Sequence, residues 1–170
     1  DSKIQMESIL LALQGFCKKY DFQVICLPPN SDPGSYEMKK IIENFSKNEW
    51  LFPMTSLPRL EFVNIIRNTS ALIGNSSMGL SEAPHYKLPV VNVGNRQKGR
   101  LNVGNVEFVS YEKNKIISAL EKAVFDEQYR EKVRNLENPY GDSSAPLKIR
   151  NAINLVDLND KKWYVKQKLC

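Results

Sequence analysis

The alternation of short apolar runs with longer segments of helical periodicity constrains the fold of this chain more than any other feature. Most of the apolar runs end at Pro or Gly and are typical of strands buried on both faces. They predict strands at 22–27, 49–52, 71–74, 88–93 and 107–109. The segments between them predict helices at 3–19, 36–45, 58–68, 76–86, 113–136 and 146–158. We therefore expect an α/β fold, a Rossmann-like parallel sheet sandwiched by helices.

Length and composition fit one globular domain. The 170 residues can form one sizeable core, and 42% hydrophobic and 25% charged residues are ordinary for a globular protein. No apolar run approaches the length of a membrane helix, and the first residues carry no signal-peptide pattern. Because the sequence begins with Asp directly before helical periodicity, we expect it to be part of a longer protein.

The charge and the cysteines exclude several classes of protein. The net charge is +5 and the pI about 9.1, but Lys and Arg are dense only at 96–100 and 161–168, without an aromatic platform for nucleic acid. Three cysteines without a CxxC pair, including Cys17 and Cys26 in apolar surroundings, predict free thiols and a cytoplasmic protein. His85 is the single histidine, so the sequence predicts no metal site.

The turn at 74–79, GNSSMG, follows a predicted strand and opens a predicted helix. Ligands of doubly wound sheets bind at the carboxyl ends of strands, where the first turn of a helix offers free N–H groups. We expect Ser76 and Ser77 to add hydroxyl donors there, and Gly79 to leave room, so that the turn holds a phosphate. Two other interpretations stay open: Ser76 as a helix cap without a ligand, or a hydrolase nucleophile, although the G-x-S-x-G spacing is missed.

Glu82 lies six residues after Ser76 and is followed by Pro84. A carboxylate at that distance from a bound diphosphate could accept both hydroxyls of a ribose. A solvated surface acid is the alternative. Pro84 predicts that this helix is short or kinked, since proline within a helix removes a hydrogen bond.

The motifs in this region resemble those of the hydrolysing UDP-N-acetylglucosamine 2-epimerases. The segment GNSSMGLSEAPHYKLPVVNVGNRQKGR at 74–100 is similar to a family pattern of a GNSS turn, a helix with a glutamate, a P-V-x-N strand and a G-x-R-Q-x-G-R loop. LPPNSDPGS at 27–35 and YGDSSAPLKI at 140–149 resemble two further elements of the family. The D-S-G-G turn and R-x-x-x-E-R-P loop of the non-hydrolysing relatives are missing.

The resemblance implies one half of a GT-B fold, in which two Rossmann-like domains face each other across a cleft. Residues 1–158 would be the C-terminal, nucleotide-binding domain and 159–170 a tail that crosses back to the N-terminal domain. An interfacial membrane helix is the alternative for this tail, given its lysines and aromatic residues. The N-terminal catalytic half would be missing from this sequence.

The resemblance also implies a set of site residues. By analogy Ser76, Ser77 and Arg96 bind the diphosphate and Glu82 the ribose, and Arg96 has the planar fork that suits phosphate oxygens. Further positions carried over from the family are Asn30 and Asp32 at the sugar end, the backbone of 53–56 at the uracil edge and Arg59 over the base. The alternatives are a solvated loop cation for Arg96 and a plain turn for Asn30 and Asp32.

Family chemistry removes UDP with loss of the proton at the 2-position and then adds water to the resulting glycal. The products are N-acetylmannosamine, a precursor of sialic and related nonulosonic acids, and UDP, and no NAD, metal or other cofactor takes part. The proton-transferring groups of the family lie in the N-terminal half, so we expect no catalytic residue in this chain and no activity of it alone. The implied partners are a UDP-sugar, the N-terminal domain and further copies in a homo-oligomer, but neither nucleic acid nor a membrane.

Two rival functions share much of this pattern. A GT-B glycosyltransferase would bind the same UDP-sugar and carry a similar helix-borne glutamate, but usually without the G-x-R-Q-x-G-R loop. A binding module would recognise a nucleotide sugar without converting it. Release of free UDP together with a 2-epimerised sugar distinguishes the epimerase from both.

Overall fold

A computed structural model describes residues 2–29, 33–141, 143–157 and 159–160. The chain forms two compact units, Asp1–Glu137 and Asn138–Cys170. The first unit holds all five described strands, and the described part of the second holds one helix. The extent of the domain and of the crossover tail expected from the sequence stay predictions, since 161–170 lie outside the described residues.

All five predicted strands are present, and they pair in parallel. They are β1 (Val24–Cys26), β2 (Leu51–Pro53), β3 (Leu72–Gly74), β4 (Val90–Val93) and β5 (Val106–Val109). β1 pairs with β2, with Ile25 opposite Phe52. Separately, β4 lies between β3 and β5. The described strands thus form one sheet of two strands and one of three.

The helices also fall where the periodicity predicts them. In the first unit they are α1 (Ser2–Tyr20), α2 (Ser35–Phe45), α3 (Arg59–Asn68), α4 (Met78–Ser81), a 3₁₀ helix η1 (Ala83–Tyr86), α5 (Lys113–Phe125) and α6 (Glu127–Arg134). The short helix predicted from Pro84 is confirmed, because the α-helix ends at Ser81 and Pro84 lies in the 3₁₀ turn. α5 and α6 are separate helices, and Asp126 caps α6 by accepting the N–H of Tyr129 at 2.9 Å.

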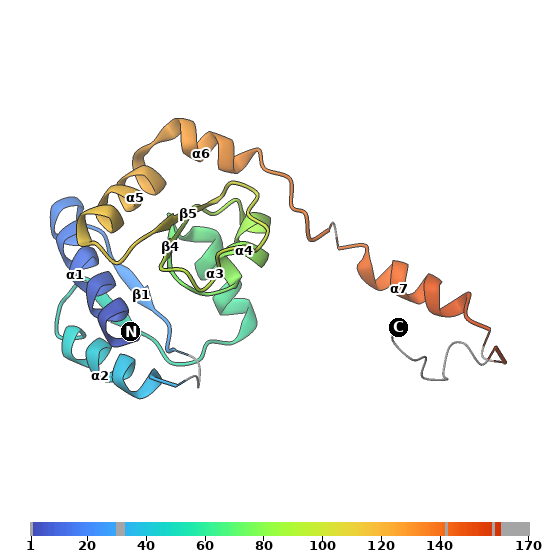
Figure 1. Cartoon of the computed structure of the whole chain (residues 1–170), viewed down its shortest axis with the longest axis horizontal. Helices are drawn as coiled ribbons and strands as arrows, with labels where there is room; N and C mark the ends of the chain where they lie inside the picture. Colours follow the sequence, from blue (N-terminus) through green and yellow to red (C-terminus); the bar gives the residue numbers. More distant parts are fainter. Residues whose placement is uncertain (1, 30–32, 142, 158, 161–170) are drawn as a thin grey trace. The chain divides into compact units, whose positions relative to one another are not determined.

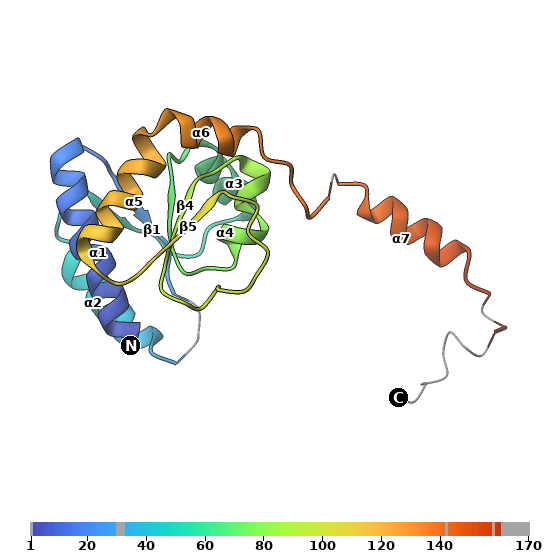
Figure 2. The same cartoon turned by 45° about the horizontal axis from the view of Figure 1, so that its top comes forward.

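The strands lie between two layers of helices. α1, α2 and α5 lie on one side and α3 and α4 on the other (Figures 1 and 2). Val91 and Val93 of β4 face a core with α1 and α5, whereas Val90 faces a smaller core with α3 and α4. Because β4 is buried at every position, it has the continuous apolar sequence of a strand covered on both faces. The predicted α/β fold class is confirmed.

The second unit contains α7 (Ala145–Asn154), which corresponds to the helix expected at 146–158. Ser144 stands at its N-cap position, but the side chain makes no cap hydrogen bond. None of the helix residues is buried, and Leu147, Ile149 and Ile153 are exposed. No helix in the described part of the chain is long and apolar enough to cross a membrane.

Candidate functional site

The candidate site begins at the turn that follows β3. Gly74 has φ of +148°, which favours glycine, and a Cβ at this position would meet nothing within 4 Å. Ser76 and Ser77 are both exposed. α4 begins only at Met78, so the two serines precede the helix, and the prediction that they lie in its first turn is wrong. The hydroxyl of Ser76 accepts the N–H of Met78 at 3.3 Å and closes a local turn before the helix.

Ser76 and Ser77 differ in the hydrogen bonds that their side chains make within this turn. The Ser76 hydroxyl accepts a hydrogen bond from the N–H of Met78. The side chain of Ser77, the N-cap residue, makes no cap hydrogen bond. The carbonyl of Ser77 accepts the N–H of Ser81 at 3.0 Å and closes the single turn of α4. The Ser77 hydroxyl is therefore exposed at a fixed backbone position, an arrangement that suits donation to a ligand.

Gly79 serves packing rather than access for a ligand, so the prediction for this residue is wrong. It is buried, and a Cβ on it would lie 2.9 Å from Cγ1 of Val90 in β4. The close approach of helix and strand excludes any side chain here. Asn105 reinforces the contact, since its buried Nδ2 donates to the carbonyl of Gly79 at 3.0 Å.

Glu82 lies at the carboxyl end of α4, half-buried, and is paired with Arg59 at the start of α3. Nη2 of Arg59 donates to Oε2 of Glu82 at 2.9 Å. This bond to the carboxylate raises the pKa of Arg59 above its ordinary value. The guanidinium also lies 5.5 Å from the ring centre of Phe62. A ribose that binds Glu82 has to share this carboxylate with Arg59.

A network of buried amides joins the serine turn to the loop that follows β4. Gln97 is 2% exposed, and its Nε2 donates to the carbonyl of Asn75 at 2.8 Å. Nδ2 of Asn75 donates to Oε1 of Gln5 at 3.1 Å, and Nε2 of Gln5 donates to the carbonyl of Val93 at 2.6 Å. The start of α1, the end of β4 and both loops are therefore held together at the carboxyl edge of the strands.

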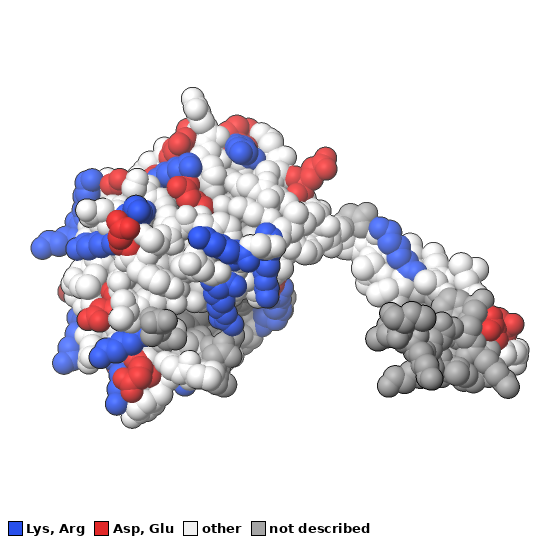
Figure 3. All heavy atoms as spheres, viewed as in Figure 1, with Lys and Arg blue, Asp and Glu red and all other residues white. Residues whose placement is uncertain are grey.

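This network joins the loop of Arg96 to the serine turn, because Arg96 directly precedes Gln97 and Asn75 directly precedes Ser76. Arg96 is exposed in the loop of 94–100. On the face shown in Figure 3, Lys and Arg lie among acidic side chains over much of the surface. That distribution agrees with the scattered basic residues of the sequence.

The remaining predicted contacts are only partly described. Asn30 and Asp32, expected at the sugar end, lie outside the described residues. In the segment expected at the uracil edge, Met54 donates its N–H to the carbonyl of Cys26 at 2.9 Å. Because Arg59 is paired with Glu82, its predicted place over a base stays a prediction.

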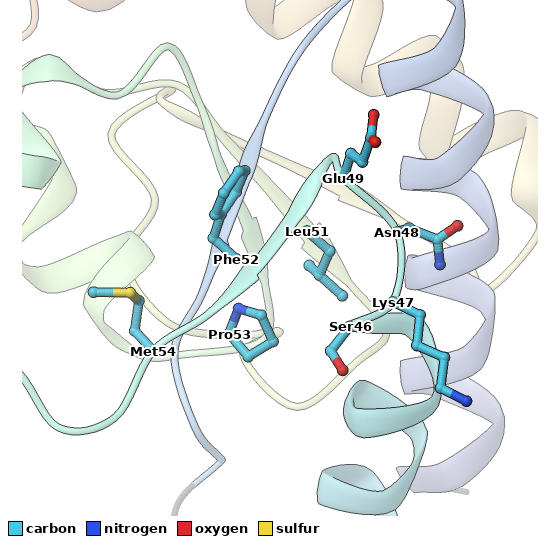
Figure 4. A pocket seen from close by; sticks show the side chains of 8 residues that line it. All are labelled: Ser46, Lys47, Asn48, Glu49, Leu51, Phe52, Pro53 and Met54. Atoms are coloured by element: carbon cyan, nitrogen blue, oxygen red, sulfur yellow. The ribbon is translucent and has the colours of Figure 1, made fainter.

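A hollow of about 460 Å³ lies beside β2, and its lining includes Pro53 and Met54 of the segment expected at the uracil edge. Figure 4 shows its lining, which comes from the turn before β2, from β2 itself and from Met54 directly after it. The lining residues are Ser46, Lys47, Asn48, Glu49, Leu51, Phe52, Pro53 and Met54. None of the predicted diphosphate or ribose residues lines it.

Gln5, Asn75 and Gln97 form a connected group that the sequence did not predict. One signal was present, since Gln5 is a polar residue on the helix face that also carries Ile9 and Leu13. A polar side chain on an apolar face has to find a hydrogen-bond partner. Its partner could not be identified, because Asn75 is 70 residues away along the chain.

Parallel strands with exposed serines and an arginine loop at their carboxyl ends define a Rossmann-like domain, a class of domain in which ligands bind at that edge. A family model described as UDP-N-acetylglucosamine 2-epimerase matches residues 1–154. The chain therefore belongs to the UDP-N-acetylglucosamine 2-epimerase family, as its motifs predict.

Curated relatives agree with this assignment. The UDP-N,N'-diacetylbacillosamine 2-epimerase (hydrolyzing) of Legionella pneumophila is 30% identical over 159 residues, which are 94% of this chain and 40% of that protein. The polysialic acid biosynthesis protein P7 of Escherichia coli is 32% identical over 152 residues, 89% of this chain and 37% of that protein. The chain therefore spans about 40% of the length of these relatives.

Solved structures show the same fold. MnaA of S. aureus in complex with UDP matches with a TM-score of 0.71 at 20% identity, over 89% of this chain and 42% of that one. The UDP-GlcNAc 2-epimerase of Neisseria meningitidis bound to UDP-GlcNAc matches with a TM-score of 0.66 at 24% identity, over 86% of this chain and 40% of that one. These matches confirm the predicted fold, one half of a GT-B architecture.

Proposed function

We propose that this chain is the UDP-binding half of a hydrolysing UDP-N-acetylglucosamine 2-epimerase. The whole enzyme would convert UDP-N-acetylglucosamine and water to N-acetylmannosamine and UDP, a step that supplies sialic or related nonulosonic acid synthesis. The observation that carries the proposal is the bond between Gln97 and Asn75, which brings the arginine loop to the serine turn. Family membership supports the same reading.

The diphosphate binds through side chains and backbone N–H groups at this junction. The hydroxyls of Ser76 and Ser77 donate to phosphate oxygens, and Arg96 adds a charge-assisted bond from the facing loop. α4 has only four residues, so its peptide dipoles add little. Most of the affinity for the two negative charges must therefore come from Arg96 and the hydroxyl donors.

Glu82 accepts the hydroxyls of the ribose in this proposal. One of its oxygens accepts a hydrogen bond from Arg59 in the absence of ligand. An ionised carboxylate has about four acceptor positions, so the half-buried Glu82 can bind a ribose while Arg59 is present, but the two partners compete for its oxygens. Asn30 and Asp32 are proposed contacts to the sugar.

This chain spans about 40% of the length of its relatives. The catalytic acids and bases are proposed to lie in the rest of the protein. The chain alone then binds UDP without turning over the sugar nucleotide. The cytoplasmic location, the homo-oligomer and the reaction without a cofactor that we expect from the sequence are part of the same proposal.

Calorimetry with UDP tests the site. In the full-length protein, Ser76→Ala, Glu82→Ala and Arg96→Ala are each expected to weaken binding, and Arg96→Ala by about tenfold or more, as for loss of a charge-assisted bond. Ser70→Ala, Glu61→Ala and Arg67→Ala are matched controls at exposed positions. Unchanged affinity in all three site variants contradicts the assignment.

Product analysis with the full-length protein tests the reaction. UDP-N-acetylglucosamine is expected to yield free UDP and the 2-epimerised sugar at equal rates. UDP-N,N'-diacetylbacillosamine serves as the competing substrate, because the Legionella relative is named for it. Transfer of the sugar to an acceptor identifies a glycosyltransferase instead, and binding without turnover identifies a binding module.

A further inference from the structure

Asn105 is a fully buried polar residue that lies outside the proposed nucleotide site. It directly precedes β5 and is 0% exposed. Its Nδ2 donates to the carbonyl of Gly79 at 3.0 Å and to the carbonyl of Leu88 at 3.3 Å. Gly79 belongs to α4, and Leu88 lies just before β4. A single side chain therefore joins α4 to the segment that leads into β4.

The backbone of Asn105 is also held by hydrogen bonds. Its carbonyl accepts the N–H of Val90, the first residue of β4, at 2.8 Å. The same carbonyl accepts the hydroxyl of Tyr129 in α6 at 2.9 Å. Because both β4 and α6 bond to this residue, its side-chain amide has a fixed position from which it donates to α4.

α4 depends on such outside contacts for its position. It has only four residues, and a single turn of helix is not stable by itself. The last carbonyls of a helix lack partners within it, and the carbonyl of Gly79 receives the amide of Asn105 instead. Gly79 also packs directly on Val90, where a Cβ would lie 2.9 Å from Cγ1. Hydrogen bonding and packing thus fix α4 at the same residue.

The position of Glu82 follows from that of α4. Glu82 is the C-cap residue of the helix, and its N–H donates to the carbonyl of Met78 at 2.9 Å. Leu80 before it and Ala83 directly after it are buried. The ion pair of its carboxylate with Arg59 is largely exposed, and such pairs fix a side chain only weakly. The backbone of α4 therefore sets where this carboxylate lies.

The acceptor half of the Asn105 amide is not satisfied. Its Oδ1 is buried and has no hydrogen-bond partner among the described residues. A buried polar group stabilises a fold well only when all of its hydrogen bonds are made. The amide is therefore better suited to fix one position of α4, through two directed donors, than to add stability.

We propose that Asn105 is a positioning residue for recognition of the ribose. Its amide holds α4, and α4 holds Glu82 where the carboxylate can accept the ribose hydroxyls. This inference rests on the proposed function, because it takes Glu82 as the contact to the ribose. Asn105 itself does not touch the ligand, since it is completely buried.

Selectivity between UDP and 2′-deoxy-UDP tests the proposal, because it measures the ribose contact separately from the stability of the fold. In calorimetry with the full-length protein, UDP is expected to bind about tenfold more tightly, the effect of one hydroxyl bonded to a carboxylate. In Asn105→Leu this preference is expected to fall to about twofold or less. The affinity for inorganic pyrophosphate should change by less than about twofold, because Gln97 holds the serine turn independently through Asn75.

Tyr129→Phe is the matched control. It removes the hydroxyl that bonds to the carbonyl of Asn105 but leaves the amide and its bond to Gly79 in place. This variant is expected to lose stability and to keep the full preference for UDP. Where Asn105→Leu does not fold, Gly79→Ala is the second variant, since its Cβ pushes α4 away from Val90. It is expected to lower the preference for UDP as well.

Failure of this inference can be distinguished from failure of the proposed function. A wild-type protein that binds UDP and 2′-deoxy-UDP equally shows that Glu82 does not hold the ribose, which overturns the proposed contact and this inference with it. A wild-type protein that prefers UDP, with the same preference in Asn105→Leu or in Gly79→Ala, overturns the positioning role alone. An equal loss of affinity for UDP, 2′-deoxy-UDP and pyrophosphate in Asn105→Leu shows a purely structural residue and also overturns it.

Discussion

Arg59 and Glu82 form an ion pair across 23 residues of sequence, with Nη2 and Oε2 2.9 Å apart. The pair joins the start of α3 to the end of α4. Glu82 is the residue expected to hold a ribose, so Arg59 occupies part of the acceptor that the ligand needs. In the proposed function, the pair would link nucleotide affinity to a residue outside the serine turn.

Replacing Arg59 by alanine is expected to strengthen UDP binding about two- to fivefold, the range for release of an exposed ion pair. The physical reason is that Glu82 no longer shares an oxygen with the guanidinium. Calorimetry measures the change, and Arg67→Ala in the same helix is the control. Weaker binding would show instead that Arg59 contacts the ligand.

Gly79→Ala is expected to lower the free energy of unfolding by about 1–3 kcal/mol, the cost of overpacking a core. The added Cβ would lie 2.9 Å from Val90, whose branched side chain has little freedom to move. Urea unfolding measures the effect. Gly15→Ala in α1 is the control and should be neutral or stabilising, since its Cβ would meet nothing closer than 3.8 Å. Equal effects of both substitutions contradict the packing role.

Gln97→Leu is expected to destabilise the protein by about 1–3 kcal/mol and to weaken UDP binding. The substitution leaves the carbonyl of Asn75 without its donor and frees the loop of Arg96 from the serine turn. Thermal unfolding and calorimetry are the two measurements. Lys98→Ala, one residue away and exposed, should leave stability unchanged. Full UDP affinity in Gln97→Leu would show that the loop is positioned by other contacts.

The two described cysteines are expected to react slowly in the folded protein. Burial raises the pKa of Cys17 to about 11 from its ordinary value of 9.0, and it also raises the pKa of Cys26. The thiolate is the reactive form, so labelling at pH 8 should be slower in the folded than in the urea-unfolded state. The rates are measured with Cys170 replaced by serine, and Cys17, which is more buried, should be the slower.

The same shift gives the sign of a pH effect on stability. Folding favours the protonated thiol of Cys17. Its contribution to the free energy of unfolding is therefore complete below pH 9.0 and is lost as the pH rises through about 11. Equal labelling rates in the folded and unfolded states would contradict both expectations.

The sequence by itself determined the elements of this fold. Strands and helices follow from apolar periodicity and from turn residues, which are local properties of the chain. The end of the α-helix at Ser81 could be predicted from the sequence in the same way, because a proline limits a helix wherever it occurs. The motif around 74–100 also predicted the family.

Only the tertiary structure decided how these elements serve the site. Gly79 was expected to leave room for a phosphate, but the distance to Val90 shows that it packs against a strand. The bonds of Gln97 to Asn75 and of Arg59 to Glu82 join residues 22 and 23 positions apart. Such partners depend on how strands and helices pack in three dimensions, and no local pattern in a single sequence encodes that.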